Sequence, residues 1–192
     1  MLRQTLAIAA VFFGTWPATA QTQGGGASSE VAGGEEEPVR TVEEWNLAEK
    51  TRLAISGYDP VAYFPEGGGA AVKGKPGIEF AYKGAVYRFA SEANRERFKA
   101  EPRKYEPAYG GWCAWAMLDG EKVEVDPKSF IVRDSRLFLF FDGFFADTRA
   151  KWQRADHDAE EAKADARWKS ISGEDPPATV EETPKDAPDG EK

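Results

Sequence analysis

Cysteine and histidine are almost absent from this chain of 192 residues, which holds one of each, Cys113 and His157. A closed zinc site takes four ligands, usually cysteine and histidine, so the chain cannot supply a thiolate-rich metal site from its own residues. Conventional Ser-His-Asp or Cys-His catalysis would have to use His157, whose setting between Asp156 and Asp158 is typical of an exposed helix start. Because the sequence has no nucleophile elbow and no phosphate-cradling glycine loop, a conventional hydrolase or phosphate-binding function is not expected.

An excess of basic charge is also lacking, because 25 Lys and Arg against 33 Asp and Glu give a formal net charge of -8 at pH 7. The excess of acid lies near the two ends of the chain. Residues 21–40 carry a net -3 and residues 172–192 a net -5, which leaves -1 for residues 41–171. The central part of the chain is therefore close to neutral and has no basic face, so a nucleic-acid partner is not expected.

No apolar run reaches the roughly 20 residues that a membrane-spanning helix needs. The run at residues 5–16 follows Arg3 and precedes Ala18-Thr19-Ala20, which fits a small-x-small cleavage site. We therefore expect residues 1–20 to be a cleaved signal peptide, with Gln21 as the mature N-terminus. This predicts a periplasmic or secreted protein that has no stable membrane insertion after cleavage.

Composition divides the rest of the chain into three parts. Residues 21–40 are rich in glycine, serine and glutamate, and residues 172–192 contain four prolines among many acids. Such segments cannot bury enough apolar surface to order themselves, so we expect a disordered leader and a disordered tail. Residues 41–171 are expected to form one small α+β domain, with antiparallel hairpins, short helices and a long C-terminal helix.

Apolar segments joined by short turns predict two antiparallel hairpins, and apolar residues alternate along the strands of the first. The first spans residues 78–89, and the second pairs residues 130–132 with residues 137–141. The last of these strands is apolar at every position, as expected of a strand that is buried on both faces. Val123 and Val125 alternate with charged residues and predict a short edge strand just before the second hairpin.

Capping patterns predict where helices begin. Residues 41–44 have the form of a capping box. Asp59 followed by Pro60 predicts a short helix with Asp59 as its N-cap. Ser91 predicts a longer helix that runs to about Glu101.

The C-terminal part of the domain is expected to be helical over residues 144–153 and 156–170, which contain few helix breakers. Small residues recur there at i, i+4, i+7 and i+11, and predict a narrow face that packs closely on another element. This stripe consists of Ala155, Ala159, Ala162 and Ala166.

The single cysteine lies in an aromatic segment, residues 109–116. One cysteine cannot form a disulfide within its own chain, so three interpretations stay open. Cys113 is the partner in an intermolecular disulfide, a small buried hydrophobic residue or a reactive thiol. In the last case Gly110-Gly111 would place it in the first turn of a helix, where free amides favour a thiolate.

Four motifs in this chain, taken in order, resemble those of the exported YHS-domain proteins of bacteria, and the resemblance covers roughly residues 45–168. It implies a single YHS-like domain. The motifs are Gly57-Tyr58-Asp59-Pro60-Val61-Ala62-Tyr63-Phe64, Tyr82-Lys83-Gly84 with Tyr87-Arg88-Phe89, Pro102-Arg103-Lys104-Tyr105, and Tyr109-Gly110-Gly111-Trp112-Cys113-Ala114-Trp115-Ala116.

The wider YHS domain is similar to small metal-binding modules of heavy-metal ATPases and of some oxygenase subunits. Its cysteines follow an Asp-Pro-Val run and lie in a Phe-Cys-x-x-x-Cys run, and the matching positions here are Ala62, Ala90 and Asn94. None of these supplies a thiolate, so the resemblance does not carry that metal site over. Some exported members resemble selenoproteins, with selenocysteine at the position of Cys113, which implies redox chemistry there.

Two function hypotheses follow, and the ligand or cofactor is open in both. In the first, Cys113 performs single-thiol redox chemistry through a sulfenic acid or mixed disulfide, and an external thiol reductant resolves it. In the second, the protein is a non-enzymatic module that uses an aromatic cleft around Cys113 to hold a metal ion or small ligand, or to dock a partner. The expected binding residues are Tyr58, Asp59, Tyr63, Tyr109, Trp112 and Trp115.

Overall fold

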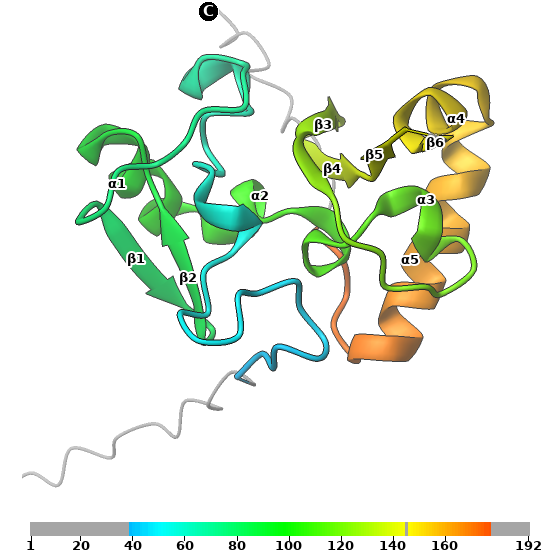
Figure 1. The fold of residues 1–192 in the computed structure, drawn as a ribbon, viewed down its shortest axis with the longest axis horizontal. Helices are drawn as coiled ribbons and strands as arrows, with labels where there is room; N and C mark the ends of the chain where they lie inside the picture. The colour runs from blue at the N-terminus through cyan, green and yellow to red at the C-terminus, as the bar shows by residue number, and fades with distance from the viewer. Residues whose placement is uncertain (1–38, 145, 178–192) are drawn as a thin grey trace, which may run out of the picture. The chain divides into compact units, whose positions relative to one another are not determined.

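The computed structural model describes residues 39–144 and 146–177, which belong to one unit of the chain. The expected signal peptide and most of the expected leader and tail lie outside the described residues. Helices and short antiparallel strand pairs make up the described part, and a long helix lies towards its C-terminal end (Figure 1). The small α+β domain expected from the sequence is confirmed.

Strands in the described ranges form three separate antiparallel hairpins. Both hairpins expected from the sequence are present, and the central residues of their turns, Lys83-Gly84 and Asp134-Ser135, all have positive φ. Two-residue turns of this kind match the right-handed twist of the flanking strands. The pairs are β1 (Glu79–Tyr82) with β2 (Ala85–Arg88), β3 (Asp126–Arg133) with β4 (Arg136–Phe140), and β5 (Asp142–Gly143) with β6 (Ala146–Asp147).

Side-chain caps begin the longer helices. Ser91 Oγ accepts a hydrogen bond from Asn94 N at 3.2 Å, and Asp156 Oδ1 accepts one from Ala159 N at 3.3 Å, so each cap satisfies an amide that has no partner within its helix. The helices predicted after Ser91 and over residues 156–170 are confirmed. With η marking a 3₁₀ helix, the helices are η1 (Ile55–Gly57), η2 (Pro65–Gly67), α1 (Glu92–Ala100), α2 (Pro102–Tyr105), η3 (Ala108–Gly111), α3 (Ala114–Met117), α4 (Thr148–Arg154) and α5 (His157–Ser172).

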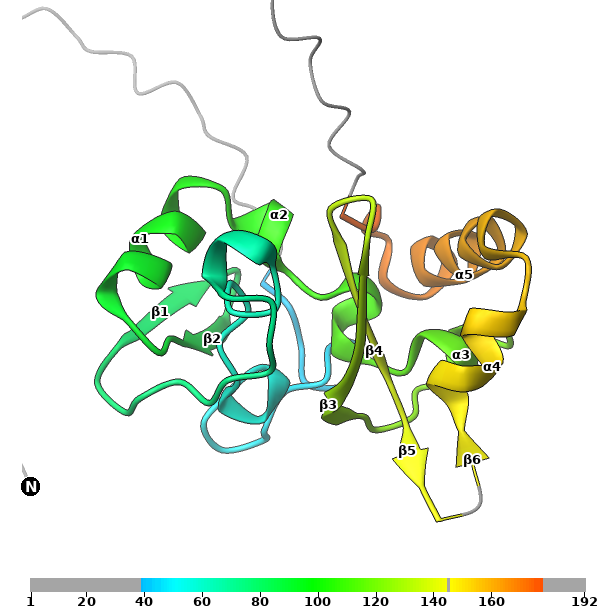
Figure 2. The ribbon, with the colours of Figure 1, turned by 90° about the horizontal axis from the view of Figure 1, so that it is seen from above.

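Strand β4 lies at the centre of the packing. Its residues Leu137 to Phe140 are fully shielded from solvent, which confirms the strand predicted to be buried on both faces. Besides β3, the elements that contact it include η3, α2, α3 and α4 (Figure 2). The segment that holds Cys113, between η3 and α3, is therefore positioned by the most deeply buried strand of the domain.

The helix expected after Asp59 does not form. Asp59 Oδ1 does accept hydrogen bonds from Val61 N and Ala62 N, as an N-cap would, but the residues that follow make only successive turns. The cause lies at Pro65, because a proline disfavours helical dihedrals in the residue before it. Phe64 accordingly has φ -84° and ψ 154°, and a helix cannot continue through it.

The structure also differs from two other predictions, the helix after the capping box at residues 41–44 and the edge strand at Val123 and Val125. Glu44 N donates to Thr41 Oγ1 at 3.2 Å, but this capping pair closes a single turn rather than beginning a helix. Val123 and Val125 do not form an edge strand, and β3 begins only after them. The carbonyl of Val123 instead accepts the backbone N–H of Cys113 at 3.0 Å, which ties this segment to the cysteine and not to a sheet.

The helix expected over residues 144–153 begins later, at Thr148. Residues 142–143 and 146–147 pair as the β5–β6 hairpin, and Asp147 Oδ1 then caps α4 by accepting from Ala150 N at 2.8 Å. Of the helices that the structure describes, none is long and apolar enough to cross a membrane.

The prediction that the alanine stripe forms the packing face of α5 is wrong. Glu161, Ala164 and Trp168 are the buried positions of the helix. Trp168 packs edge-on against Trp45 with ring centroids 5.6 Å apart, and Glu161 is paired with arginines of β3 and β4. A large ring and a paired charge therefore decide which face is buried. The exposed members of the stripe are Ala159, Ala162 and Ala166.

Candidate functional site

The glycines before Cys113 are required by the backbone they form. Tyr109, Gly110 and Gly111 all have positive φ, a conformation that residues with a Cβ rarely adopt. A Cβ at Gly110 would also lie 2.7 Å from the Trp168 ring and 3.1 Å from the Trp45 ring. The absence of a Cβ at Gly110 therefore lets two tryptophans pack over the chain just ahead of the cysteine.

The structure places Cys113 at the N-cap position of α3, one residue before the helix, and not within its first turn as expected. Its side chain makes no capping hydrogen bond to the helix amides, and it is 0% exposed. The predicted stabilisation of a thiolate by free amides is therefore wrong. The sulfur is used elsewhere, because Phe141 N donates to Sγ at 3.3 Å.

Thr148 completes a closed set of hydrogen bonds around the sulfur. Its hydroxyl donates to the carbonyl oxygen of Phe141 at 2.6 Å, and its Oγ1 lies 3.4 Å from Cys113 Sγ. A hydroxyl carries only one proton, and Thr148 directs that proton to the Phe141 carbonyl. The hydrogen bond between Sγ and Oγ1 is therefore assigned to the S–H group as donor. Sγ therefore donates one hydrogen bond and accepts one within the domain.

The side chains predicted to form a cleft with Cys113 are hydrogen-bonded to other parts of the domain. Tyr109 Oη donates to Asp165, and the Trp112 indole N–H donates to the Glu44 carbonyl, both at 2.8 Å. Tyr63 Oη donates to the Pro127 carbonyl, also at 2.8 Å. Over the described residues, the hydrogen bonds of the sulfur go only to Thr148 and Phe141. The other two aromatic residues contact lysines: Tyr58 with Lys73, and Trp115 with Lys151.

Asp59 has a different role from the one expected of a ligand-binding group. Its carboxylate is fully buried and accepts four hydrogen bonds, which is about the full capacity of a carboxylate. Oδ1 is bonded to Val61 N and Ala62 N, and Oδ2 to Ala90 N at 2.8 Å and Asn94 Nδ2 at 2.7 Å. Ala62, which is 28 positions from Ala90 in the sequence, thus gathers with Ala90 and Asn94 around one carboxylate, and these are the three positions compared above with the YHS cysteines.

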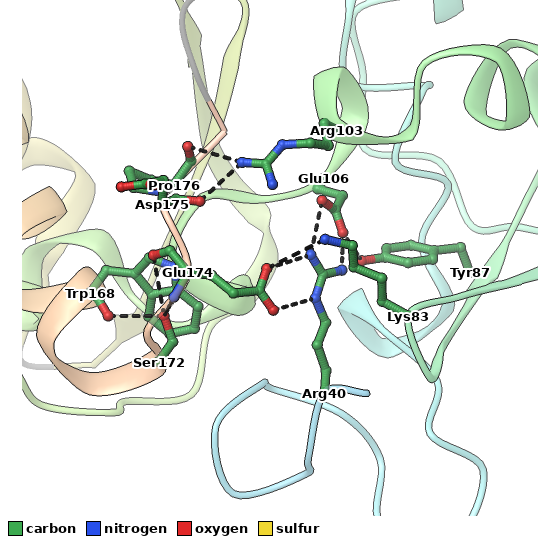
Figure 3. Close-up of polar contacts among 10 residues, drawn as sticks. All are labelled: Arg40, Lys83, Tyr87, Arg103, Glu106, Trp168, Ser172, Glu174, Asp175 and Pro176. Carbon is green, nitrogen blue, oxygen red and sulfur yellow. Dashed lines mark hydrogen bonds and ion pairs between the residues drawn. The ribbon is translucent and has the colours of Figure 1, made fainter. Parts of the chain in front are cut away.

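Sequence reasoning missed the most deeply buried charge cluster, which lies around Arg40 (Figure 3). Its guanidinium is paired with both carboxylate oxygens of Glu106 and, at 3.0–3.1 Å, with both of Glu174. The side chains of Arg40 and Glu106 are each 1% exposed. The Trp45 ring lies 3.5 Å from the guanidinium carbon, so the cation is stacked as well as paired.

Burial and pairing act in opposite directions within this cluster. Burial alone would lower the pKa of Arg40, but its hydrogen bonds to Glu174 and Glu106 outweigh burial and raise it, so the guanidinium stays charged. Burial raises the pKa of the Glu106 carboxyl, against the opposing effect of Arg40. Tyr87 Oη donates to Glu106 at 3.3 Å, and burial raises the pKa of this tyrosine well above its usual range.

No short sequence pattern could have identified this cluster, because Arg40 and Glu174 lie 134 positions apart. Composition assigned Arg40 to the disordered leader and Glu174 to the disordered tail, yet the structure packs both into the domain. Helix α5 itself continues to Ser172, and Pro177 is buried. The folded part thus extends beyond residues 41–171 at both ends.

A second group of charges fixes the β3–β4 turn on α5. Arg136 pairs with Asp165 at 2.7 Å and with Glu161 at 3.4 Å, and Arg133 pairs with Asp158 and Glu161. Asp165 also accepts the Tyr109 hydroxyl, so the aromatic segment is connected to this group. We interpret these contacts as structural, because every carboxylate in them has an arginine partner.

Within the described ranges, no three or more His, Cys, Asp or Glu side chains are grouped so that they could hold a metal ion. The comparisons with known proteins found no matching family model, curated protein or solved structure. The resemblance to the YHS family therefore stays a prediction.

Proposed function

We propose that this chain is an exported, YHS-like module that acts by docking a partner and not by catalysis, with Cys113 as a structural residue. The observation that supports this most directly is the enclosed sulfur, which is 0% exposed and has both its donor and its acceptor capacity used within the domain. A thiol that attacks a peroxide or a disulfide must be deprotonated and within reach of it.

Family membership and export are part of the proposal. The gathering of Ala62, Ala90 and Asn94 around Asp59 supports it, because these positions would form one site if the chain shared the YHS fold. Export to the periplasm is supported by the signal-like residues 1–20. Intact-mass measurement of protein recovered from a periplasmic extract tests this, and a mature chain that begins at Gln21 is the expected result.

The role of Cys113 is tested by its alkylation rate on the folded mature protein, measured against pH. We expect no labelling until denaturant unfolds the domain, at a rate that follows unfolding. Thr148→Val removes the acceptor of the S–H group and should raise the labelling rate, whereas Thr51→Val, at an exposed position, should not. A rate that reaches its plateau well below pH about 8.5 would contradict the proposal and restore the redox hypothesis.

A further inference from the structure

The chain that follows α5 is held in the way that a bound peptide is held. We call residues 173–177 the strap. Gly173 has φ 74° and ends the helix, and the strap then passes the cluster around Arg40 (Figure 3). Arg40 donates hydrogen bonds to both carboxylate oxygens of Glu174. This bidentate geometry fixes the orientation of the carboxylate. Lys83 Nζ lies 4.0 Å from the same carboxylate.

Arg103 contacts the main chain of the strap. Its Nη2 donates to the carbonyl oxygens of Asp175 at 3.0 Å and Pro176 at 3.4 Å. The Asp175 carboxylate is paired with Lys169 at 2.6 Å, and Pro177 is buried. Side chains of the domain thus contact an acid and two successive carbonyl groups of the strap, and the proline that follows them is buried. Charged groups, main-chain carbonyls and prolines are features that peptide-binding sites recognise.

The charges of the two surfaces are complementary. Arg40 and Lys83 face the carboxylate of Glu174, and Lys169 of α5 pairs with the carboxylate of Asp175. Each of the two acids of the strap therefore lies against a cation of the domain. Because Glu106 already neutralises Arg40, the strap is not needed to balance that buried cation.

We propose that Arg40, Lys83 and Arg103 form a binding site for an acidic, proline-containing peptide, which the strap occupies in cis and a partner protein's segment of the same chemistry occupies in its place. The strap competes as a tethered ligand, at a high effective concentration set by its short connection to α5. The inference names the partner for the docking role proposed above and so rests on it. It makes no use of Cys113, so alkylation and peptide binding can fail separately.

The test uses the full mature chain and a fluorescent synthetic peptide with the sequence of residues 172–180, Ser-Gly-Glu-Asp-Pro-Pro-Ala-Thr-Val. The double variant Glu174→Gln, Asp175→Asn weakens the strap in cis. The matched control is Glu49→Gln, Glu121→Gln, which removes the same charge from exposed positions. Fluorescence anisotropy at low salt is expected to give about tenfold tighter peptide binding by the strap variant than by the control.

Two further arms make the outcome decisive. Adding Arg103→Ala to the strap variant, or replacing the glutamate of the peptide with glutamine, should weaken the binding. Equal binding by the strap variant and its control, or binding that ignores the peptide's glutamate, would overturn the proposal.

A second measurement on the wild-type protein stands even if the double variant does not fold. A displaceable strap must open more readily than the whole domain unfolds, so the amide of Glu174 should exchange with solvent faster than those of β4. Exchange of that amide only by global unfolding would equally defeat the proposal.

Discussion

Asp59 and Asn94 are joined by a hydrogen bond of 2.7 Å between Oδ2 and Nδ2, although 35 positions separate them in the sequence. The same carboxylate accepts the backbone amides of Ala62 and Ala90. One buried side chain therefore binds the loop after η1 to the start of α1. Its role is to position two elements, and the four hydrogen bonds that it accepts offset the cost of burying a carboxylate.

Asp59→Ala is expected to lower the free energy of unfolding by about 3 kcal/mol or more, because it leaves several buried donors without an acceptor. Asp59→Asn should lose much of the same stability, since its amide group cannot accept from every donor. Denaturant titration measures both losses. Asp119→Ala is the control, because that carboxylate is 81% exposed and should contribute within about 1 kcal/mol. A loss at Asp59 no larger than the control's would refute this role.

The β1–β2 and β3–β4 hairpins could be predicted from sequence because their information is local. In each case two apolar segments and the turn between them lie within one short window. Ser91 predicted α1 for the same reason, since a cap acts on an amide three residues away. Helix α5 was predicted from a long run with few helix breakers, which is also local information. The helix after Asp59 failed because the local signal was incomplete. The cap is present, but Pro65 ends the turn too early.

Gly110→Ala is expected to destabilise the domain by several kcal/mol more than Gly69→Ala. Both glycines have a similar φ, 61° and 68°, so the backbone cost of about 1–2 kcal/mol is shared. Only at Gly110 would the new Cβ clash, at 2.7 Å from Trp168 and 3.1 Å from Trp45, whereas nothing lies within 4 Å of it at Gly69. Thermal unfolding of the two variants compares them. Equal losses of stability would mean that the Trp45 and Trp168 rings can shift to make room for the new Cβ at no cost in free energy.

The candidate site was harder to predict, because its contacts join distant parts of the chain. The segment around Cys113 was identified, but the partners of its sulfur, Phe141 and Thr148, lie 28 and 35 positions away and have no distinctive sequence pattern. Glu161 looked like a solvent-facing residue of α5, yet Arg133 and Arg136 bring it into the interior. Composition cannot detect a single charge whose partner lies elsewhere in the chain.

Arg40→Ala is expected to cost about 3–5 kcal/mol near neutral pH, because it leaves the buried Glu106 carboxylate without its main partner. The double variant Arg40→Met, Glu106→Gln should recover part of this loss. Lys99→Ala, which breaks a largely exposed pair with Glu96, serves as the control and should change stability by less than about 1 kcal/mol.

The loss of stability caused by Arg40→Ala, which we call its deficit, should also depend on pH. Burial raises the pKa of Glu106, and loss of the arginine raises it further, so the folded variant retains a proton that the unfolded chain releases above pH about 4.5. The stability linked to that proton is present below about pH 4.5 and is lost as pH rises. Denaturant titration at pH 4 and pH 7 should therefore show the smaller deficit at pH 4. A deficit that is the same at both values would mean that Glu106 is already neutral or well solvated in the variant.

Three buried tyrosines predict a loss of stability in alkali. Burial is the largest cause that raises the pKa of Tyr63, Tyr87 and Tyr109 far above the usual value of about 10. Each hydroxyl also donates a hydrogen bond that a phenolate could not make. The folded state therefore keeps protons that the unfolded chain releases, so stability is intact below pH about 10 and falls as pH rises above it.

Each of these tyrosines should contribute about 1.4 kcal/mol of destabilisation per pH unit above that point. An ultraviolet titration that follows phenolate absorbance should show part of the signal appearing only when circular dichroism reports unfolding. Tyr63→Phe should remove one tyrosine from that late fraction, because the ring stays while the ionisable hydroxyl is lost. If all six tyrosines of the chain titrated reversibly in one step near pH 10 while the domain stayed folded, their hydroxyls could not be enclosed as this structure has them.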